Sequence, residues 1–288
     1  MDDKKRITFR HKNSTACPVC SHEFHREEML SGGGRLIAGN LTDELRRSYE
    51  VSKKYGVVIP LIYILTVCPN CFYTSNQKDF ENLLPNEIET LRNLTPARKN
   101  AVKKFFGTIS FNDDRNLMMG AASYMLNIDC YGVRNKKIAP TFKSAVSAIR
   151  AAWLFMDLAK EMPDRPYKKL AYFFYKKAYV FYVRVVDLIQ SGEEPSDAAG
   201  NMGPDTDKNW GYEGILYMTA MLTVKIGSRE PDIHKRIENF EKCKRYLSRL
   251  FGMGKSSKSR PSDLLDKTKD LYETINESLE EWMQQVAE

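Results

Sequence analysis

The sequence predicts a mostly α-helical protein with a small β module at its N-terminus. Two Cys-Pro-x-Cys turns, Cys17–Cys20 and Cys68–Cys71, lie in the first quarter of the chain. A β-branched and aromatic run over 57–67 leads into the second turn, and helical spacing dominates the chain after it. We therefore expect a zinc-ribbon-like module over 1–80, followed by a tetratricopeptide-like helical-hairpin array over 81–288.

The four cysteines of the paired turns are candidate ligands for one structural Zn²⁺. Tetrahedral zinc takes about four soft ligands, and two turns with two thiolates each supply all of them. Proline after the first cysteine of each pair favours a turn that directs both sulfurs to one point. The 47 residues between Cys20 and Cys68 exceed the usual ribbon spacer, so an inserted segment is expected there.

Other roles for these cysteines fit less well. A thioredoxin-type pair needs a βαβ context, and haem attachment needs a histidine directly after the pair, where Ser21 stands. A disulfide framework needs secretion, yet no apolar signal segment follows the first six residues. Whether His22 or His25 contributes to the metal site stays open. Cys130 and Cys243 are expected to be buried thiols.

The inserted spacer is expected to contain a short polar helix and a strand. Asp43–Tyr55 has a helical pattern, and Val57–Val67 has strand length and composition. Pro60 lacks an N–H group, which favours an edge position or a bulge in that strand.

Eight helices are expected after residue 80, separated by proline- or glycine-rich breaks. Thr95 is the expected N-cap of the second, because proline follows it at the first helical position. The predicted ranges are Glu81–Leu94, Pro96–Phe106, Asp113–Cys130, Pro140–Met162, Tyr167–Gln190, Tyr212–Ile226, Pro231–Phe251 and Pro261–Ala287.

The pair Pro140–Met162 and Tyr167–Gln190 matches the size pattern of a tetratricopeptide repeat. Large and small residues recur at the expected spacing in both helices: Phe155, Leu158, Ala159 and Met162 in the first, and Ala171, Tyr175 and Ala178 in the second. A generic bundle of nested amphipathic helices is the alternative.

Basic residues recur along the second of these helices, at Lys169, Lys176 and Arg184. One interpretation is a surface that binds a partner. The alternative is a solvated edge, in which the aliphatic parts of the lysines cover the aromatic rings beneath them.

Composition favours an ordinary globular protein with an uneven charge. Residues 1–190 carry 30 basic and 19 acidic side chains, whereas residues 191–288 carry 14 and 18. The basic part makes a nucleic-acid-binding role the main alternative function. No apolar run is long enough to cross a membrane, so we expect no membrane partner and a cytoplasmic location.

Enzymatic motifs are missing from the sequence, and we expect no catalytic residues. It contains neither HExxH nor GxSxG. Gly252–Ser257 lacks the glycine spacing of a phosphate-binding loop and is expected to be a flexible turn. A closed four-thiolate zinc site keeps no position for a reactive water, which favours a structural role.

The paired turns, the apolar run, Val67–Tyr73 and Asp79-Phe80 together resemble a bacterial family, the domain of unknown function 2225. The stretch Ala148–Leu154 is similar to that family's first repeat helix. The resemblance implies a paired-CxxC module joined to a tetratricopeptide-like domain in the bacterial cytoplasm. Ser21 and Phe72 depart from it, because a glycine commonly follows each turn.

These observations favour a non-enzymatic scaffold or adaptor. In this hypothesis the structural zinc module supports a helical-repeat surface, and that surface binds a protein partner of unknown identity. Nucleic-acid binding is less favoured, because the basic residues near the cysteine turns alternate with acidic ones.

Overall fold

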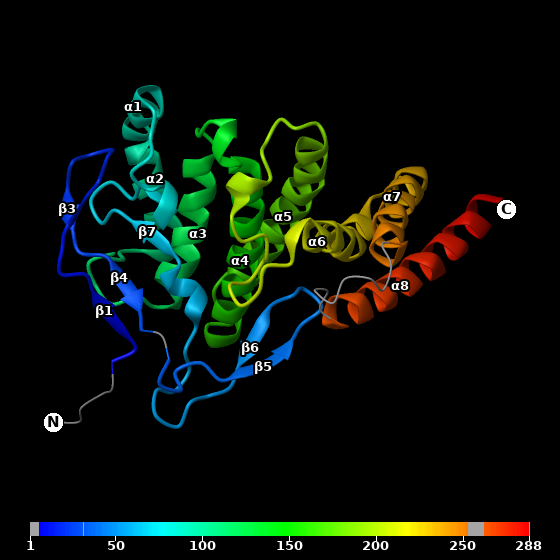
Figure 1. Ribbon diagram of the computed structural model, residues 1–288, viewed down its shortest axis with the longest axis horizontal. Coiled ribbons are helices and arrows are strands. Elements are labelled where there is room, and N and C mark those ends of the chain that lie inside the picture. Colours follow the sequence, from blue (N-terminus) through cyan, green and yellow to red (C-terminus); the bar gives the residue numbers. More distant parts are fainter. Residues whose placement is uncertain (1–5, 31, 253–261, 288) are drawn as a thin grey trace.

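The structure is a computed structural model that describes residues 6–30, 32–252 and 262–287. Within these ranges the protein is mostly helical, with small antiparallel strand pairs in its N-terminal part (Figure 1). The helices are α1 (Pro85–Asn93), α2 (Thr95–Phe106), α3 (Leu117–Tyr131), α4 (Pro140–Glu161), α5 (Tyr167–Gln190), α6 (Gly211–Ile226), α7 (Ile233–Gly252) and α8 (Ser262–Ala287).

The described strands form four separate two-stranded sheets: β1–β4, β2–β3, β5–β6 and β7–β8. Their bounds are β1 (Thr8–Arg10), β2 (Thr15–Ala16), β3 (Glu23–Phe24), β4 (Glu27–Met29), β5 (Ala38–Leu41), β6 (Arg47–Tyr49), β7 (Leu65–Val67) and β8 (Thr74–Asn76). An isolated two-stranded pair is only marginally stable in water. These hairpins therefore depend on the helices, and on each other, for their stability.

From α3 to α8, each helix packs on the one before it (Figure 1). The contact between α4 and α5 is the most extensive, and a stack of aromatic rings fills the space beside it. In that stack the Phe155 ring centroid lies 5.3 Å from that of Phe174 and 5.7 Å from that of Phe106. Burial of these large rings supplies much of the core's apolar area.

The hydrophobic core crosses the predicted domain boundary at residue 80. Leu45, Leu61 and Leu65 are buried in the same cluster as the helical residues. Tyr124 of α3 donates a hydrogen bond to the carbonyl of Leu61 at 2.8 Å. The division into 1–80 and 81–288 stays a prediction, but the two parts share one core.

Two predictions about the spacer are wrong. Asp43–Tyr55 is not a helix, because β6 and tight turns occupy this range. Only the last three residues of Val57–Val67 form a strand, β7. A 3₁₀ turn over Pro60–Tyr63 replaces the expected bulge, since Pro60 has no N–H for a strand ladder but fits the start of a helical turn.

The helical predictions after residue 80 are confirmed in position, with shifted ends. Leu117 and Pro85 begin their helices four residues later than expected. Thr95 is not an N-cap: Leu94 precedes α2, and the Thr95 hydroxyl donates to the carbonyl of Leu91. Most of the expected turn at Gly252–Ser257 lies outside the described residues. No helix in the described part of the chain is long and apolar enough to cross a membrane.

Gly120 allows the 3₁₀ turn to pack closely against α3. A Cβ atom at Gly120 would lie 2.5 Å from Cγ2 and 3.2 Å from Cα of Ile62. Alanine has a helix propensity about 1 kcal/mol better than glycine, but here it would push two backbones apart. We expect Gly120→Ala to lower the unfolding free energy by about 1–3 kcal/mol, measured by chemical denaturation.

Gly132→Ala is the matched control for this variant. Gly132 follows α3 with a helical φ, and a Cβ there would meet ordinary contacts of 3.4 Å or more. This variant should keep the stability of the natural protein. Equal stability of both variants would show that the turn does not press on α3.

Candidate metal centre

The two cysteine turns have the same backbone geometry. Cys17 and Cys20 lie in the turn between β2 and β3, and Cys68 and Cys71 lie between β7 and β8. In the first turn, the N–H of Ser21 donates to the carbonyl of Cys17 at 2.8 Å; in the second, Phe72 donates to Cys68 at 3.0 Å. Each turn is thus a β-hairpin end that presents two thiols on one side.

Ser21 and Phe72 adopt left-handed backbone angles, with φ of 61° and 58°. Glycine takes this conformation without cost, whereas other residues pay on the order of 1–2 kcal/mol. Packing of the Phe72 side chain offsets part of this cost, because its ring centroid lies 5.2 Å from that of Phe111. Both turns therefore end in the left-handed conformation that glycine favours, although neither has a glycine at this position.

All four sulfur atoms of Cys17, Cys20, Cys68 and Cys71 lie within 4.8 Å of one another. The Cys17–Cys71 and Cys20–Cys68 sulfur pairs are each 3.6 Å apart. Tetrahedral Zn²⁺ with Zn–S bonds near 2.3 Å needs sulfurs about 3.8 Å apart. This spacing is far longer than a disulfide bond and suits four thiolates around one ion.

Hydrogen bonds among the thiols favour a negative charge on one sulfur atom and oppose it on two others. Hydrogen bonds from the thiols of Cys17 and Cys71 lower the pKa of Cys68, whereas the same thiol–thiol contacts raise the pKa of Cys17 and of Cys71. The side-chain amide of Asn70 donates to the sulfur of Cys20 at 3.5 Å. A metal ion would bind all four sulfurs as thiolates, and four soft sulfur donors fit a soft divalent metal.

The histidines near the turns lie away from the sulfur group. His22 and His25 are both exposed, and Nδ1 of His25 lies 2.8 Å from the carbonyl oxygen of His11. In the described part of the chain, the group with metal-binding geometry contains only cysteines. The two remaining thiols, Cys130 and Cys243, are buried as expected, and burial raises the pKa of each to about 11.

Two arginines attach the cysteine turns to the helices. Arg92 of α1 donates to the carbonyl of Val19 at 3.1 Å, inside the first turn. Buried Arg98 of α2 donates to the carbonyl of Cys71 through Nε and Nη2, at 3.4 and 3.2 Å. Hydrogen bonds from charged donors are stronger than neutral ones, so both turns are held against the same helix pair.

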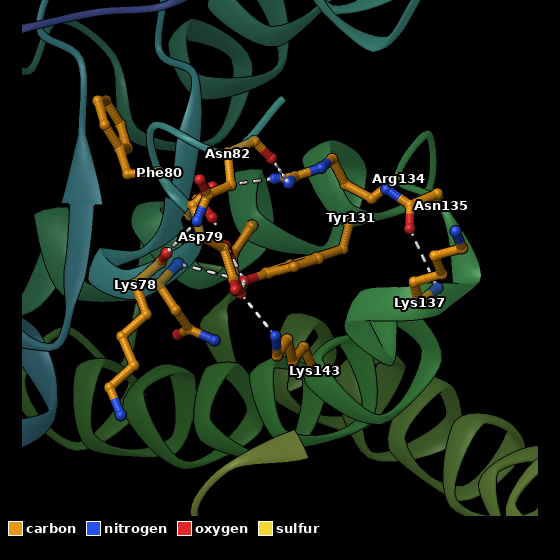
Figure 2. Close-up of polar contacts among 12 residues, drawn as sticks. Lys78, Asp79, Phe80, Asn82, Tyr131, Arg134, Asn135, Lys137 and Lys143 are labelled. Carbon is orange, nitrogen blue, oxygen red and sulfur yellow. Dashed lines mark hydrogen bonds and ion pairs between the residues drawn. The ribbon is translucent and has the colours of Figure 1, made fainter. Parts of the chain in front are cut away.

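A second polar network joins the end of β8 to α3 and α4 (Figure 2). Figure 2 shows the carboxylate of Asp79 between the hydroxyl of Tyr131 and the ammonium of Lys143, which donate to it. Arg134 donates to Glu87 at 3.1 Å and to the carbonyl of Asn82. Sequence reasoning missed this network. A signal was available in α4, where Lys143 interrupts a face of small and apolar residues.

The residues of the predicted basic surface lie on α5, far along the chain from the cysteines. Lys169, Lys176 and Arg184 are all exposed. They contribute no donor to the sulfur group.

Residues 11–275 match a family described as an uncharacterized protein conserved in bacteria, DUF2225. The chain belongs to this family. An uncharacterized protein from Borreliella burgdorferi (strain B31) is 40% identical over 275 residues, which cover 96% of this chain and 98% of that relative. No solved structure matches the chain. Membership in DUF2225 confirms the resemblance found in the sequence and assigns no activity.

Loss of one sulfur should remove the metal. We expect the natural protein, purified anaerobically, to hold one zinc per chain by elemental analysis, and Cys68→Ser to hold much less. Structural zinc contributes roughly 10–16 kcal/mol of apparent binding energy in small modules, so the variant's hairpins should also lose protection from proteolysis. Cys130→Ser changes a buried thiol outside the sulfur group and should keep its zinc; natural protein without metal would contradict the site.

The pair of Glu87 and Arg134 should make stability sensitive to acid. Burial alone raises the pKa of Glu87, but hydrogen bonds from Leu84 and Asn135, together with Arg134, lower it. A lowered pKa in the folded state contributes stability above the unfolded pKa of about 4.3, and this contribution is lost as the pH falls. Both side chains are almost completely buried.

Glu87→Gln should therefore unfold more easily at neutral pH, by about 3 kcal/mol, since it leaves a buried cation unpaired. Its unfolding free energy should fall less steeply below pH ~4.3 than that of the natural protein. Denaturant titrations at several pH values measure both effects. Glu89→Gln, at an exposed position of the same helix, is the control and should change neither; equal acid slopes for Glu87→Gln and the natural protein would contradict the assignment.

Proposed function

We propose that this protein is a non-enzymatic scaffold or adaptor of the bacterial cytoplasm, in which a structural zinc module supports a helical surface that binds a protein partner. The four-sulfur group supports a structural role for the metal. Its sulfurs supply all four positions of a tetrahedral ion, and three of its four cysteines are buried.

Packing of α4 on α5 supports a tetratricopeptide-like hairpin. Phe155 and Leu158 of α4 and Ala171 and Ala178 of α5 are fully buried, as the repeat register expects. The small alanines allow the two helices to approach closely, and Pro163 and Pro166 lie in the turn between them. A repeat of this type commonly exposes helix faces for binding other proteins.

The observation that carries the proposal is an exposed stripe along α5. Basic and apolar residues alternate on it at helical spacing, and we name it the α5 stripe: Lys169, Phe173, Lys176, Val180 and Arg184. Phe173 is 50% exposed and Val180 is 62% exposed. Contiguous exposed apolar surface that is rimmed by polar residues is typical of interaction sites. The stripe suits a partner segment that presents apolar side chains flanked by carboxylates.

The nucleic-acid alternative is weakened by ion pairs in the basic N-terminal part. Arg26 contacts Glu28, Arg46 contacts Asp157, and Arg47 contacts Asp207 at 2.9 Å. Paired side chains attract phosphate less than isolated ones do, because the neighbouring carboxylate opposes the approach of an anion. The excess of basic residues in residues 1–190 therefore overstates the charge offered to nucleic acid.

Charge reversal on the α5 stripe tests the proposal. We expect Lys169→Glu/Lys176→Glu/Arg184→Glu to abolish recovery of the partner in affinity purification from bacterial extract, in the presence of nuclease. Thermal stability should change little, because exposed substitutions usually alter the unfolding free energy by about 0.5 kcal/mol or less.

A triple variant with the same change in net charge provides the control: Lys103→Glu/Lys235→Glu/Lys269→Glu, all at exposed positions on other helices. It should keep partner recovery. Unchanged recovery in the stripe variant would identify the stripe as a solvated edge. A sequence-dependent nucleic-acid complex that survives 200 mM salt would favour the alternative, since binding through counterion release alone weakens steeply with salt.

A further inference from the structure

The tip of the β5–β6 hairpin enters the helical array. The hairpin leaves the cysteine module and runs beside α4 and α6, with its end directed toward α8 (Figure 1). Its body is largely exposed: Ile37 and Val51, on either side of the strands, are 42% and 67% exposed. Only the tip, residues 42–47, makes extensive contacts with the helices.

Glu44 at the tip lies in a socket formed by three helices. Its carboxylate accepts hydrogen bonds from Nε1 of Trp153 in α4, from the hydroxyl of Tyr175 in α5 at 2.8 Å, and from Nζ of Lys225 in α6. Lys225 also lies over the Tyr175 ring, 4.3 Å from its centroid. Three donors from three helices on one carboxylate make a specific site for an acidic side chain.

The two residues beside Glu44 also contact the helices or the core. Leu45 is completely buried and takes a left-handed φ of 55°, which a leucine adopts only when packing compensates its cost. The carbonyl of Asp43 accepts from Tyr217 of α6 at 2.8 Å. The Asp43 carboxylate lies 2.7 Å from Nζ of Lys267 in α8.

The C-terminal side of the tip continues this pattern with basic residues. Arg46 pairs with Asp157 of α4 through both of its terminal nitrogens. The backbone N–H of Arg47 donates to Asp205 at 2.8 Å, and its side chain pairs with Asp207. Five consecutive residues thus meet complementary groups on α4, α5, α6, α8 and the loop before α6. A peptide that binds in a groove makes the same kinds of contact: a buried apolar anchor, charged flanking residues and main-chain hydrogen bonds.

We propose that this groove is a binding site for a loop of a partner protein that presents an acidic residue followed by leucine and arginine, and that the chain's own hairpin tip occupies it as an intramolecular ligand. The proposal rests on the proposed function, in that the occupant is a protein segment. It adds a second surface with a different requirement: the α5 stripe suits apolar side chains flanked by carboxylates, while the groove takes an acid–leucine–arginine sequence.

Competition with the tip sets how tightly such a partner binds. A tethered ligand acts at an effective concentration on the order of millimolar, so a free segment with equal contacts is largely excluded. Only molecules whose tip has left the groove can bind the free segment. The apparent affinity therefore rises in proportion to the fraction of molecules in which the groove is empty. The groove is therefore closed to weak ligands and open to a partner that displaces the tip.

A cyclised, fluorescein-labelled peptide of residues 38–49 of this chain serves as the probe, measured by fluorescence anisotropy with the full-length protein. The variant Glu44→Ala/Leu45→Ala, here called the emptied protein, removes the two side chains at the centre of the groove and so weakens the hold on the tip. We expect it to bind the peptide about tenfold or more tighter than the natural protein. Adding Trp153→Phe/Tyr175→Phe/Lys225→Met removes the three donors and should reverse the gain. A peptide carrying the Glu44→Ala change should not bind.

Equal binding by the natural and emptied proteins, with matching helical content and metal content, would overturn the proposal. Light scattering would also overturn it if the natural protein were a dimer and the emptied protein a monomer. The tip of one copy would then occupy the groove of a second copy. If the emptied variant does not fold, hydrogen exchange on the natural protein decides. Exchange of the Arg46 and Arg47 amides through local opening supports a displaceable ligand, and exchange only through global unfolding overturns it.

These measurements are independent of the α5 stripe. Peptide binding is measured with purified components, and charge reversal on the stripe leaves Trp153, Tyr175 and Lys225 in place. A stripe variant that keeps partner recovery therefore refutes the stripe without affecting the groove, and an empty groove that binds no peptide refutes the groove without affecting the stripe.

Discussion

Closure of the chain between Cys20 and Cys68 is the constraint on which the N-terminal half depends. The sulfur group brings together two turns that are 47 residues apart in the sequence. Closing a flexible loop of that length costs about 3–4 kcal/mol in chain entropy, beyond a constant term. A structural zinc ion contributes several times that amount. The chain between the two turns must therefore begin and end at the candidate metal centre. It does so through β4, the β5–β6 hairpin and the 3₁₀ turn.

The orientation of this closed module on the helices is set by polar contacts from three arginines, of which Arg98 and Arg134 are buried and Arg92 is exposed. Arg92 and Arg98 each bind a carbonyl of a cysteine turn, and Arg134 binds Glu87 and the carbonyl of Asn82. Apolar surfaces can slide past one another at small cost, whereas a buried arginine that loses its acceptor pays the full cost of desolvation. The two buried arginines therefore select one arrangement of module and helices among those that apolar packing alone would permit.

The parts of the fold that depend on local sequence could be predicted, and those that depend on distant residues could not. The cysteine turns and the helices after residue 80 follow from spacing, proline positions and periodicity. Asp43–Tyr55 contains good helix formers, which is why propensity predicts a helix there. In the structure, Trp153, Tyr175 and Lys225 hold Glu44 from more than 100 residues away, and these contacts outweigh propensity. No local pattern predicts that Leu45 adopts a left-handed backbone conformation and is buried in the core.

The spacer between the cysteine turns is thus fixed at two places, the candidate metal centre and the tip of the β5–β6 hairpin. The interactions at these two places differ in strength. At the candidate metal centre, the four cysteines would share one ion, so the loss of any of them would disrupt the whole group. At the tip, the contacts are separate ion pairs and hydrogen bonds. The side chain of Asp43 is largely exposed and that of Lys225 is partly exposed, so water and salt can replace their partners one at a time. Opening begins where contacts can be exchanged singly. Because the cysteine turns have their own links to α1 and α2 through Arg92 and Arg98, the proposed release of the tip would leave these links unchanged.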